Sequence, residues 1–503
     1  MNFAIAVLDI GMTNKKVAVY DDQLSQVFVR YRNFSPKIID EMETHDLEEI
    51  ESWIIAQLSE AASLYPIKAI SVSTHGATFV CVGKDGRPSV PCVYYTHEPG
   101  DDFQHRFYKR FGDPLTLQKQ TGTPPLKAMI NAAKGILFAK ETFPDQCAQT
   151  EHILYYSQYW GFRFTGKVGM EGTYPGCHTY LWDQLENKPS SVAEDLGIVP
   201  FMQKQFGNSW DIQGTITSEL AKKTGLPKDV IVTMGIHDSN AALLPHIAKQ
   251  GKSGFVVNST GTWCVSMKAV NEYGFKPEDL GKIVFFNISA FKTPVKTAIF
   301  LGGQEFEIWM KLLQKIHNRK DFPPDDEKYY QSILKEQTAF LMPELIPGSG
   351  QFPQSKARII ENGKIYLFED IESGASIPNL FQHYEEAYAL LNISLAMQSL
   401  TALERTGLNP GESVFTEGGF KKNQIYNTLV SAGIPSNKVF LTDIAEASAL
   451  GAAMIARMAL TGQSLQDLAD ILNIDYYEVE KPSLPEVFSY REAWLKHSVM
   501  EIV

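Results

Sequence analysis

The chain has 503 residues, of which 44% are hydrophobic and 21% charged, and its net charge is −12 at pH 7. This length exceeds what one hydrophobic core usually supports, so we expect a globular protein of at least two domains. The acidic balance, with no basic run, argues against nucleic-acid binding, which requires clustered positive charge. No apolar stretch approaches the roughly 18 residues of a membrane helix, and the N-terminus lacks a basic leader, which predicts a cytoplasmic protein without membrane contact.

The five cysteines are scattered along the sequence and never form a CxxC pair, which indicates free thiols in a reducing compartment. Histidine and cysteine also never cluster at the short spacings that zinc sites use, so we expect no dedicated transition-metal site. A full P-loop and a GxGxxG turn after a strand are both missing. A nucleotide site in this protein must therefore be built from other patterns.

Short apolar runs that are typical of strands alternate with longer helical patterns. The strand-like runs near the N-terminus are residues 3–10, 15–21 and 69–74. Residues 45–65 repeat apolar side chains at helical spacing, and the second half has its own helical patterns over residues 381–407 and 446–460. This mixture predicts an α/β fold.

A weak internal repeat divides the chain. Residues 8–20, LDIGMTNKKVAVY, and residues 256–267, VVNSTGTWCVSM, each have the pattern of a strand, a Gly/Thr turn and a second strand. One such turn is usually a plain hairpin, but two of them half a chain apart predict two similar domains. We place the boundary between residues 245 and 246, which gives domains 1–245 and 246–503.

The first turn carries residues suited to a phosphate and its metal ion. Gly11 lets backbone N–H groups approach an anion, Thr13 and Asn14 add side-chain donors, and Lys16 adds positive charge. The carboxylate of Asp9 would repel a phosphate, so its sensible role is to hold Mg²⁺. An ordinary hairpin turn is the alternative explanation.

Two later segments have the same character. Gly261 and Thr262 lie in the second turn, which offers hydroxyls and a glycine. Gly418 and Gly419 end a strand-like run before a helix, where a glycine pair permits close approach of a flat group or a phosphate. Asn423 falls in the first turn of that helix, where its amide could contact adenine. Taken in isolation, a hairpin and a simple strand–helix loop explain these segments equally well.

Asp238 lies where a strand-like run gives way to a helix, in the segment GIHDSNAALL at residues 235–244. Most aspartates at such junctions cap the helix by accepting hydrogen bonds from its first backbone N–H groups, so the position alone favours a cap. The alternative is a chemical role in front of the helix.

Taken together, DIGMTNKK, NSTGTW, EGGFKKN and GIHDSN resemble, in order and spacing, the motifs of the FGGY family of carbohydrate kinases. The likeness covers nearly the whole chain. It implies two ribonuclease-H-like domains of the actin and Hsp70 type with a cleft between them, the first holding a sugar and the second most of the ATP. It further implies ATP and Mg²⁺ as cofactors and a homodimer as the assembly.

By this resemblance Asp238 is the general base that accepts the proton of a sugar hydroxyl, and together with Asp9 it lies at the metal ion. A helix N-terminus favours an ionised carboxylate, so we expect this base to be ready at neutral pH. The family also has a glycine at the position of Gly303, which we therefore expect near the nucleotide. A polyol or aldonate kinase, a non-catalytic ATP switch and a sugar sensor are the alternatives to a ketose kinase.

The region expected to contact the sugar departs from the family pattern. His75–Gly76 resembles a xylulokinase motif and the residues after it a rhamnulokinase motif, which points to a ketose of the rhamnulose, fuculose or xylulose type. In residues 94–102, Thr96, His97 and Glu98 stand where the family commonly carries Trp, Asp and Arg. We predict His75, Gly76 and His97 as sugar contacts, although a lone histidine in an apolar strand context is more often a core residue. Met12 stands where the family usually has Thr or Ser, so the first turn has one hydroxyl fewer than the family pattern.

Overall fold

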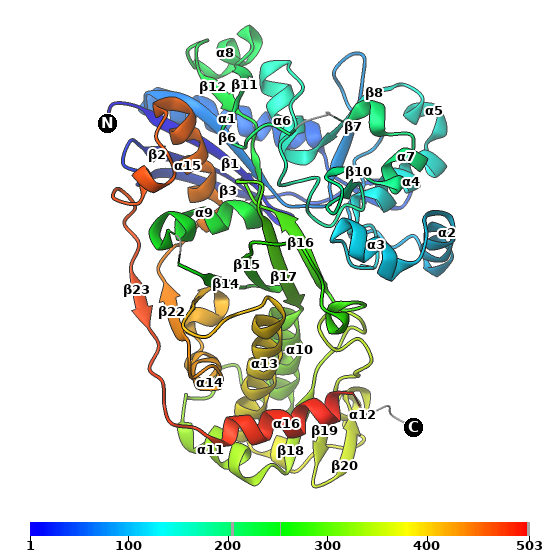
Figure 1. The fold of residues 1–503 in the computed structure, drawn as a ribbon, viewed down its shortest axis with the longest axis vertical. Helices are drawn as coiled ribbons and strands as arrows, with labels where there is room; N and C mark the ends of the chain where they lie inside the picture. The colour runs from blue at the N-terminus through cyan, green and yellow to red at the C-terminus, as the bar shows by residue number, and fades with distance from the viewer. Residues whose placement is uncertain (203–205, 252, 500–503) are drawn as a thin grey trace.

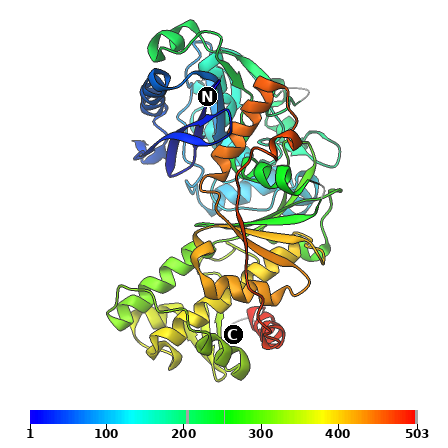
Figure 2. The same ribbon diagram turned by 90° about the vertical axis from the view of Figure 1, so that its left-hand side faces the viewer.

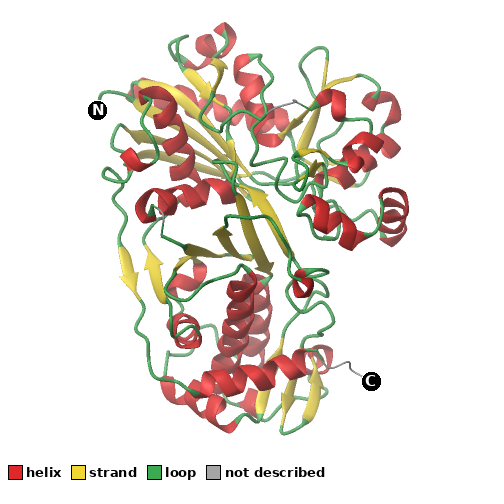
Figure 3. Ribbon diagram, in the orientation of Figure 1, coloured by secondary structure: helices red, strands yellow, loops and turns green. Residues whose placement is uncertain are grey.

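The computed structural model describes residues 1–202, 206–251 and 253–499, which form two lobes, each built around a large mixed sheet (Figure 1, Figure 3). The strands of the first sheet are β1 (Ala4–Ile10), β2 (Asn14–Asp21), β3 (Gln26–Asn33), β6 (Ile67–Thr74), β11 (Ile212–Thr215), β12 (Ile231–Thr233) and β13 (Ile236–His237). They are arranged in the order β11–β12–β6–β1–β2–β3, and β13 pairs with the end of β6.

The second sheet repeats the topology of the first. Its strands are β14 (Phe255–Thr260), β15 (Cys264–Ala269), β16 (Val284–Ile288), β17 (Pro294–Phe300), β21 (Ser413–Gly418), β22 (Lys438–Thr442) and β23 (Tyr476–Glu478), in the order β16–β17–β15–β14–β21–β22–β23. In both sheets an antiparallel hairpin, β1–β2 or β14–β15, is followed by two parallel neighbours and an antiparallel edge strand. The α/β fold class and the two similar halves expected from the repeat are confirmed.

The remaining elements cover these two sheets and form small satellite sheets. In the first lobe they are α1 (Leu47–Leu64), α2 (Asp101–Phe111), α3 (Pro114–Thr121), α4 (Ala132–Thr142), α5 (Pro144–Cys147), α6 (Tyr156–Thr165), α7 (Ser191–Asp195), α8 (Ser218–Thr224), β4 (Lys37–Ile39), β5 (Met42–Thr44), β7 (Phe79–Gly83), β8 (Thr150–Tyr155), β9 (Trp182–Asp183) and β10 (Lys188–Pro189). Later in the chain come α9 (Asp238–Gln250), α10 (Gly302–His317), α11 (Glu327–Glu336), α12 (Phe368–Ser373), α13 (Tyr384–Arg405), α14 (Gln424–Gly433), α15 (Ala447–Thr461), α16 (Glu486–Ser498), β18 (Ala339–Met342), β19 (Arg358–Glu361) and β20 (Lys364–Leu367).

The helix predicted over residues 45–65 forms as α1. Its N-terminus is fixed by Asp46, whose side chain accepts a hydrogen bond from the backbone N–H of Glu49. The buried face carries Ile50, Ile54 and Leu58 at helical spacing and packs into the core of the first lobe. Within the described part of the chain, no helix combines the length and the apolar character needed to cross a membrane.

Helix α15 lies near the C-terminus but packs on the first lobe, beside α9, as Figure 2 shows. A Cβ added to Gly451 would lie 2.0 Å from the carbonyl oxygen of Ala241, so the two helices touch backbone to backbone. One hydrophobic cluster joins residues 449–456 to strands β1 and β6. The sequence pattern predicted this helix correctly as part of the second half of the chain, but it did not predict that the helix packs on the first lobe. The boundary between residues 245 and 246 stays a prediction, and it falls inside α9.

Candidate active site

Asp238 is the first residue of α9 and follows directly after β13. The N-cap position belongs to His237, and the Asp238 carboxylate accepts hydrogen bonds from its neighbour Ser239, at 2.5 Å from the backbone nitrogen and 3.2 Å from Oγ. Its side chain keeps 31% of its surface exposed. The geometry is therefore not that of a helix cap, in which the side chain binds an N–H group two or three residues ahead.

A cavity of about 200 Å³ opens in front of Asp238, between the two lobes. The first lobe contributes His75, Gly76, Ala77, Tyr95, Leu126, Ile130, Cys177, His178, His237, Asp238 and Ser239, and the second contributes Trp263, Val265, Phe285, Asn287, Thr297 and Ile299. Asp238 is the only acid among these described lining residues, and they include no lysine or arginine. The expected cleft between two domains is therefore present, and it encloses an acid among neutral groups.

The environment of Asp238 changes its proton affinity. Burial, and secondarily the negative charge of Asp9, raise the pKa of Asp238 to about 7. We expected the helix N-terminus to favour the ionised form, and the net direction is the opposite, because burial and the charge of Asp9 outweigh the two hydrogen bonds from Ser239 that favour that form. The carboxylate is consequently balanced between its two protonation states near neutral pH.

Asp9 and Lys16 face each other across the β1–β2 hairpin. The Lys16 Nζ atom forms an ion pair with Asp9 Oδ2 at 2.9 Å and another with Glu446, while the Ser448 hydroxyl donates to the same Asp9 oxygen at 2.8 Å. Burial lowers the pKa of Lys16, but the charges of Asp9 and Glu446 outweigh it, so the pKa is raised overall. Glu446 and Ser448, from the start of α15, were missed by sequence reasoning, because they lie more than 400 residues from Asp9.

Asp9 is suited to hold a hard cation. Its Oδ2 atom receives the bonds from Lys16 and Ser448, whereas Oδ1 accepts no hydrogen bond from any described residue. The influence of its charge on Asp238 places the two carboxylates in one electrostatic neighbourhood. Carboxylate oxygens are the ligands that Mg²⁺ prefers, so the residues present fit this ion.

The three glycine-containing segments that we predicted at the nucleotide in the second half of the chain come together in the second lobe. A Cβ on Gly303 would lie 2.0 Å from the Gly261 carbonyl oxygen, and one on Gly418 would lie 2.1 Å from that of Thr260. The N-terminus of α10, the β14–β15 turn and the end of β21 therefore pack backbone to backbone. Gly419 begins the 3-10 turn that follows β21.

The side chains expected to bind phosphate differ in availability. Thr13, Asn14 and Thr262 are exposed at their turns. The backbone N–H of Gly11 donates to the Asn14 carbonyl at 3.0 Å, so this group serves the hairpin itself. Asn423 caps α14 by accepting from the Tyr426 N–H at 3.0 Å, and its amide donates to Asn392 at 2.5 Å. Its donor is thus engaged within the protein.

The predicted sugar contacts separate into two groups. His75 and Gly76 line the cavity, and burial lowers the pKa of His75 to about 3, which keeps the ring neutral. His97 is absent from the described lining residues and instead packs against Phe138, with ring centres 5.2 Å apart. From the same unusual segment it is Tyr95 that reaches the cavity.

Sequence reasoning also missed the sulfur and imidazole groups of the cavity. Cys177, His178 and His237 lie together there, although the sequence spacing predicted no such cluster. Two of them stand in the segment GCHTYLWD, and the third directly precedes Asp238. Spacing rules overlooked them because nearly 60 residues separate the two parts.

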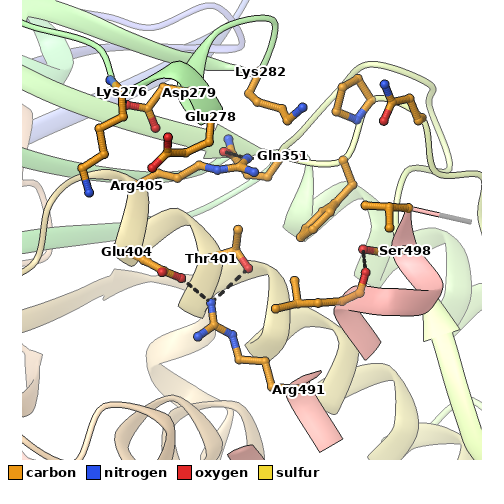
Figure 4. Close-up of a pocket in the computed structure, with 15 residues that line it drawn as sticks. Lys276, Glu278, Asp279, Lys282, Gln351, Thr401, Glu404, Arg405, Arg491 and Ser498 are labelled. Carbon is orange, nitrogen blue, oxygen red and sulfur yellow. Dashed lines mark hydrogen bonds and ion pairs between the residues drawn. The ribbon is translucent and has the colours of Figure 1, made fainter. Parts of the chain in front are cut away.

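A second cavity, of about 280 Å³, lies in the second lobe (Figure 4). It is larger than the cleft cavity, but all its described lining residues fall between 276 and 499 and include none from the glycine-rich turns. Its charges are partly engaged with one another, since Arg491 donates to Glu404 at 2.7 Å and to Thr401 at 3.4 Å. We therefore place the active site at the cleft.

Two similar lobes, paired glycine-rich hairpins and a cavity between them define the actin-like ATPase fold. The sequence profile of the N-terminal domain of the FGGY family of carbohydrate kinases matches residues 4–245, and that of the FGGY C-terminal domain matches residues 252–464. The chain therefore belongs to the FGGY family of carbohydrate kinases.

Individual relatives are more distant. An L-fuculokinase of Salmonella typhi is 25% identical over 210 residues, which are 42% of this chain and 43% of that relative. The structure of a carbohydrate kinase from Novosphingobium aromaticivorans superposes with a TM-score of 0.81 at 24% identity, covering 99% of this chain and 98% of that one. A xylulose kinase from Lactobacillus acidophilus gives 0.78 at 17% identity, covering 98% and 96%. These two likenesses establish the fold.

Proposed function

We propose that this protein is an ATP-dependent kinase that transfers the γ-phosphoryl group to a hydroxyl of a ketose bound in the cleft cavity. The observation that carries the proposal is the Asp238 carboxylate, the one acid among the described residues around the cavity. The donor follows from the family, whose kinases use ATP. The domains, 1–245 for the sugar and 246–503 for most of the nucleotide, are part of the same proposal.

Asp238 is the general base in this proposal. With a pKa of about 7 it is partly ionised at neutral pH, and a general base works best when its pKa lies near the working pH. Phosphoryl transfer passes through a loose transition state, so the attacking hydroxyl needs aiming more than early deprotonation. The two hydrogen bonds from Ser239 hold the carboxylate in place for this task.

Asp9 and Asp238 hold Mg²⁺ in the proposal, and the bound ion supplies neutralisation of the phosphate charge. Lys16 begins engaged with Asp9 and Glu446 rather than free at the turn. Its contact with a phosphate therefore requires an exchange of ion pairs when the nucleotide binds. Such an exchange couples the position of α15, through Glu446, to nucleotide occupancy.

The phosphate chain is gripped from both lobes. Thr13 and Asn14 offer exposed donors from the first hairpin, and Thr262 is exposed at the second, where Gly261 allows close approach although its own N–H donates to the Trp263 carbonyl at 3.0 Å. The glycines Gly303, Gly418 and Gly419 and the residue Asn423 complete the proposed nucleotide site. Because water excluded from between the lobes cannot take the phosphoryl group, transfer to the sugar is favoured over hydrolysis.

The cavity lining indicates which acceptor fits. An aldonate would bring a carboxylate into a space whose described lining has no cationic side chain, which burial makes costly. A neutral ketose can instead use the imidazoles together with Asn287 and Thr297. Trp263, Val265 and Ile299 add apolar lining from the second lobe, which would suit the methyl group of a 6-deoxyketose of the rhamnulose or fuculose type.

ADP release measured against a panel of ketoses, polyols and aldonates tests the proposal. We expect release to depend on a ketose and to fall at least 1,000-fold in Asp238→Asn, which keeps the shape but removes the base. Asp229→Asn is a matched control, because that side chain is 72% exposed and its described ion-pair partner is Lys68 at 3.5 Å. ATP hydrolysis indifferent to every sugar would instead identify a switch, and sugar binding without turnover a sensor.

A further inference from the structure

Cys177, His178 and His237 form a cluster on the first-lobe side of the cleft cavity. Their ligand atoms, one per side chain, all lie within 4.8 Å of one another, and the Cys177 sulfur is 3.6 Å from Nε2 of His237. Tetrahedral zinc holds ligands at about 2.0–2.3 Å, which puts ligand atoms about 3.3–3.8 Å apart. One pair already has this separation, and the others need only small side-chain adjustments.

The ring of His178 is fixed in a way that leaves one nitrogen free. Its Nδ1 atom donates to the backbone carbonyl of Ile130 at 2.9 Å, which assigns the proton to Nδ1 and the lone pair to Nε2. Histidines that bind metal ions are commonly oriented by such a bond to a backbone carbonyl. His178 also has a φ of 40°, a backbone conformation that non-glycine residues rarely adopt and that concentrates at functional sites.

The side chain of Asn240 can orient the His237 ring, as the Ile130 carbonyl orients the His178 ring. The Asn240 amide nitrogen lies 3.4 Å from His237 Nδ1, and the amide oxygen is buried without a hydrogen bond from any described residue. A half-turn of this amide lets its oxygen accept the Nδ1 proton, which satisfies the buried oxygen and frees Nε2. The second imidazole can thus be supported in the same way as the first.

Gly76 leaves the space in which these groups meet. A Cβ on Gly76 would stand 2.9 Å from Nε2 of His178 and 2.9 Å from Nε2 of His237. The two nitrogen atoms therefore border one small volume, and a side chain on Gly76 would fill it. The same volume opens to the cavity and adjoins Asp238, whose Oδ1 lies 3.3 Å from His237 Nε2.

We propose that Cys177, His178 and His237 bind one Zn²⁺ ion, with a fourth coordination position open to the cavity. A thiolate with two imidazoles selects a borderline-soft ion such as Zn²⁺ over Mg²⁺, which prefers oxygen ligands. Three protein ligands and one open position are typical of zinc sites that bind an exchangeable ligand, here water or a substrate hydroxyl. The site adjoins Asp238, which the kinase proposal also places at Mg²⁺, but its three ligands are other residues, and the proposal does not depend on kinase activity.

Metal binding is measured directly, without ATP or sugar. The purified chain is stripped with a chelator and titrated with Co²⁺, which replaces Zn²⁺ and absorbs strongly when a thiolate is bound. We expect one Co²⁺ per chain, a sulfur-to-cobalt charge-transfer band in the near ultraviolet, and displacement by Zn²⁺ but not by Mg²⁺. A rise in melting temperature with Zn²⁺ provides a second readout on the unaltered protein.

The variants Cys177→Ser and His178→Gln should weaken Co²⁺ binding at least 100-fold, and the first should abolish the charge-transfer band. Cys264→Ser is the matched control, since Cys264 is also buried and free but lies in the second lobe. Retention of the band in Cys177→Ser, or its loss in Cys264→Ser, would overturn the assignment. The assignment would also be overturned if the unaltered protein retained no Co²⁺ through gel filtration. In that case the imidazoles would remain as partners for sugar hydroxyls, and the kinase proposal would be unaffected.

Discussion

Replacing Gly303 by alanine tests whether the packed turns of the second lobe hold the nucleotide. A Cβ at this position would stand 2.0 Å from the carbonyl oxygen of Gly261 and 3.1 Å from the amide nitrogen of Thr262. Both atoms belong to the backbone, so no side-chain rotation can relieve the overlap. The turn at Gly261 must retreat by about 1.4 Å before ordinary van der Waals contact, which begins near 3.4 Å, is restored.

This displacement sets the expected magnitudes. Overpacking of this kind costs about 1–3 kcal/mol of the free energy of unfolding, which lowers the melting temperature by a few degrees. A misplacement of about 1 Å in groups that position a substrate costs up to about 100-fold in rate. We therefore expect kcat/KM for ATP to fall 10- to 100-fold in Gly303→Ala, with a much smaller change in the KM for the sugar.

Steady-state kinetics with each substrate varied in turn, together with thermal unfolding, provide the measurement. Gly274→Ala is the control, because a Cβ on Gly274 would meet no atom within 4 Å. A Gly303→Ala enzyme with the same KM for ATP as the Gly274→Ala enzyme would show that the turn does not carry the nucleotide. An increase in the KM for the sugar, with no change in the KM for ATP, would also contradict the assignment of this turn to nucleotide binding.

Three further predictions concern pH and packing. Because burial raises the pKa of Asp238 to about 7, kcat/KM should fall about tenfold per pH unit below that value, and a pH profile flat between 5 and 8 would contradict the base assignment. The pKa of His75 is depressed by burial to about 3, so as the pH falls below about 6.5 the unfolded chain takes up this proton and the folded chain does not. Between pH 7 and pH 5 the free energy of unfolding, measured with urea, should therefore decline by about 2 kcal/mol more in the unaltered protein than in His75→Gln, and equal declines would contradict the prediction. Gly451→Ala should lower the melting temperature by several degrees, since its Cβ would lie 2.0 Å from the Ala241 carbonyl oxygen, whereas a variant as stable as Gly274→Ala would refute the close helix contact.

The fold was largely predictable because its signals are local. Two apolar runs around a Gly/Thr turn indicate a hairpin, and the two hairpins β1–β2 and β14–β15 form as predicted. The face of α1 follows from apolar spacing alone. The docking of α15 could not be predicted, because an alanine-rich helix does not indicate which of two similar sheets it will cover. The tertiary contacts of α15, such as that of Gly451 with Ala241, decide this.

The candidate site was predictable where motif and position coincide, as for Asp238 at the end of a strand. Its raised pKa was not, because desolvation depends on what the distant Cys177 and Trp263 segments place around the cavity. The ion pair of Lys16 with Glu446 was hidden for the same reason: it joins the two ends of the chain. Electrostatic environment is a property of the assembled fold, and sequence spacing carries little of it.

The return of α15 to the first lobe limits how the two halves can move against each other. The chain crosses between them after α9, again between β22 and α15, and a third time between α15 and β23 (Figure 1). A single connection would let the lobes rotate in any direction. Several crossings anchored by the packed helices α9 and α15 instead restrict the rotation to one axis, as a hinge does. We therefore expect the lobes to rotate about that axis rather than to slide past each other, which would return the opposing walls of the cleft to the same position after each opening.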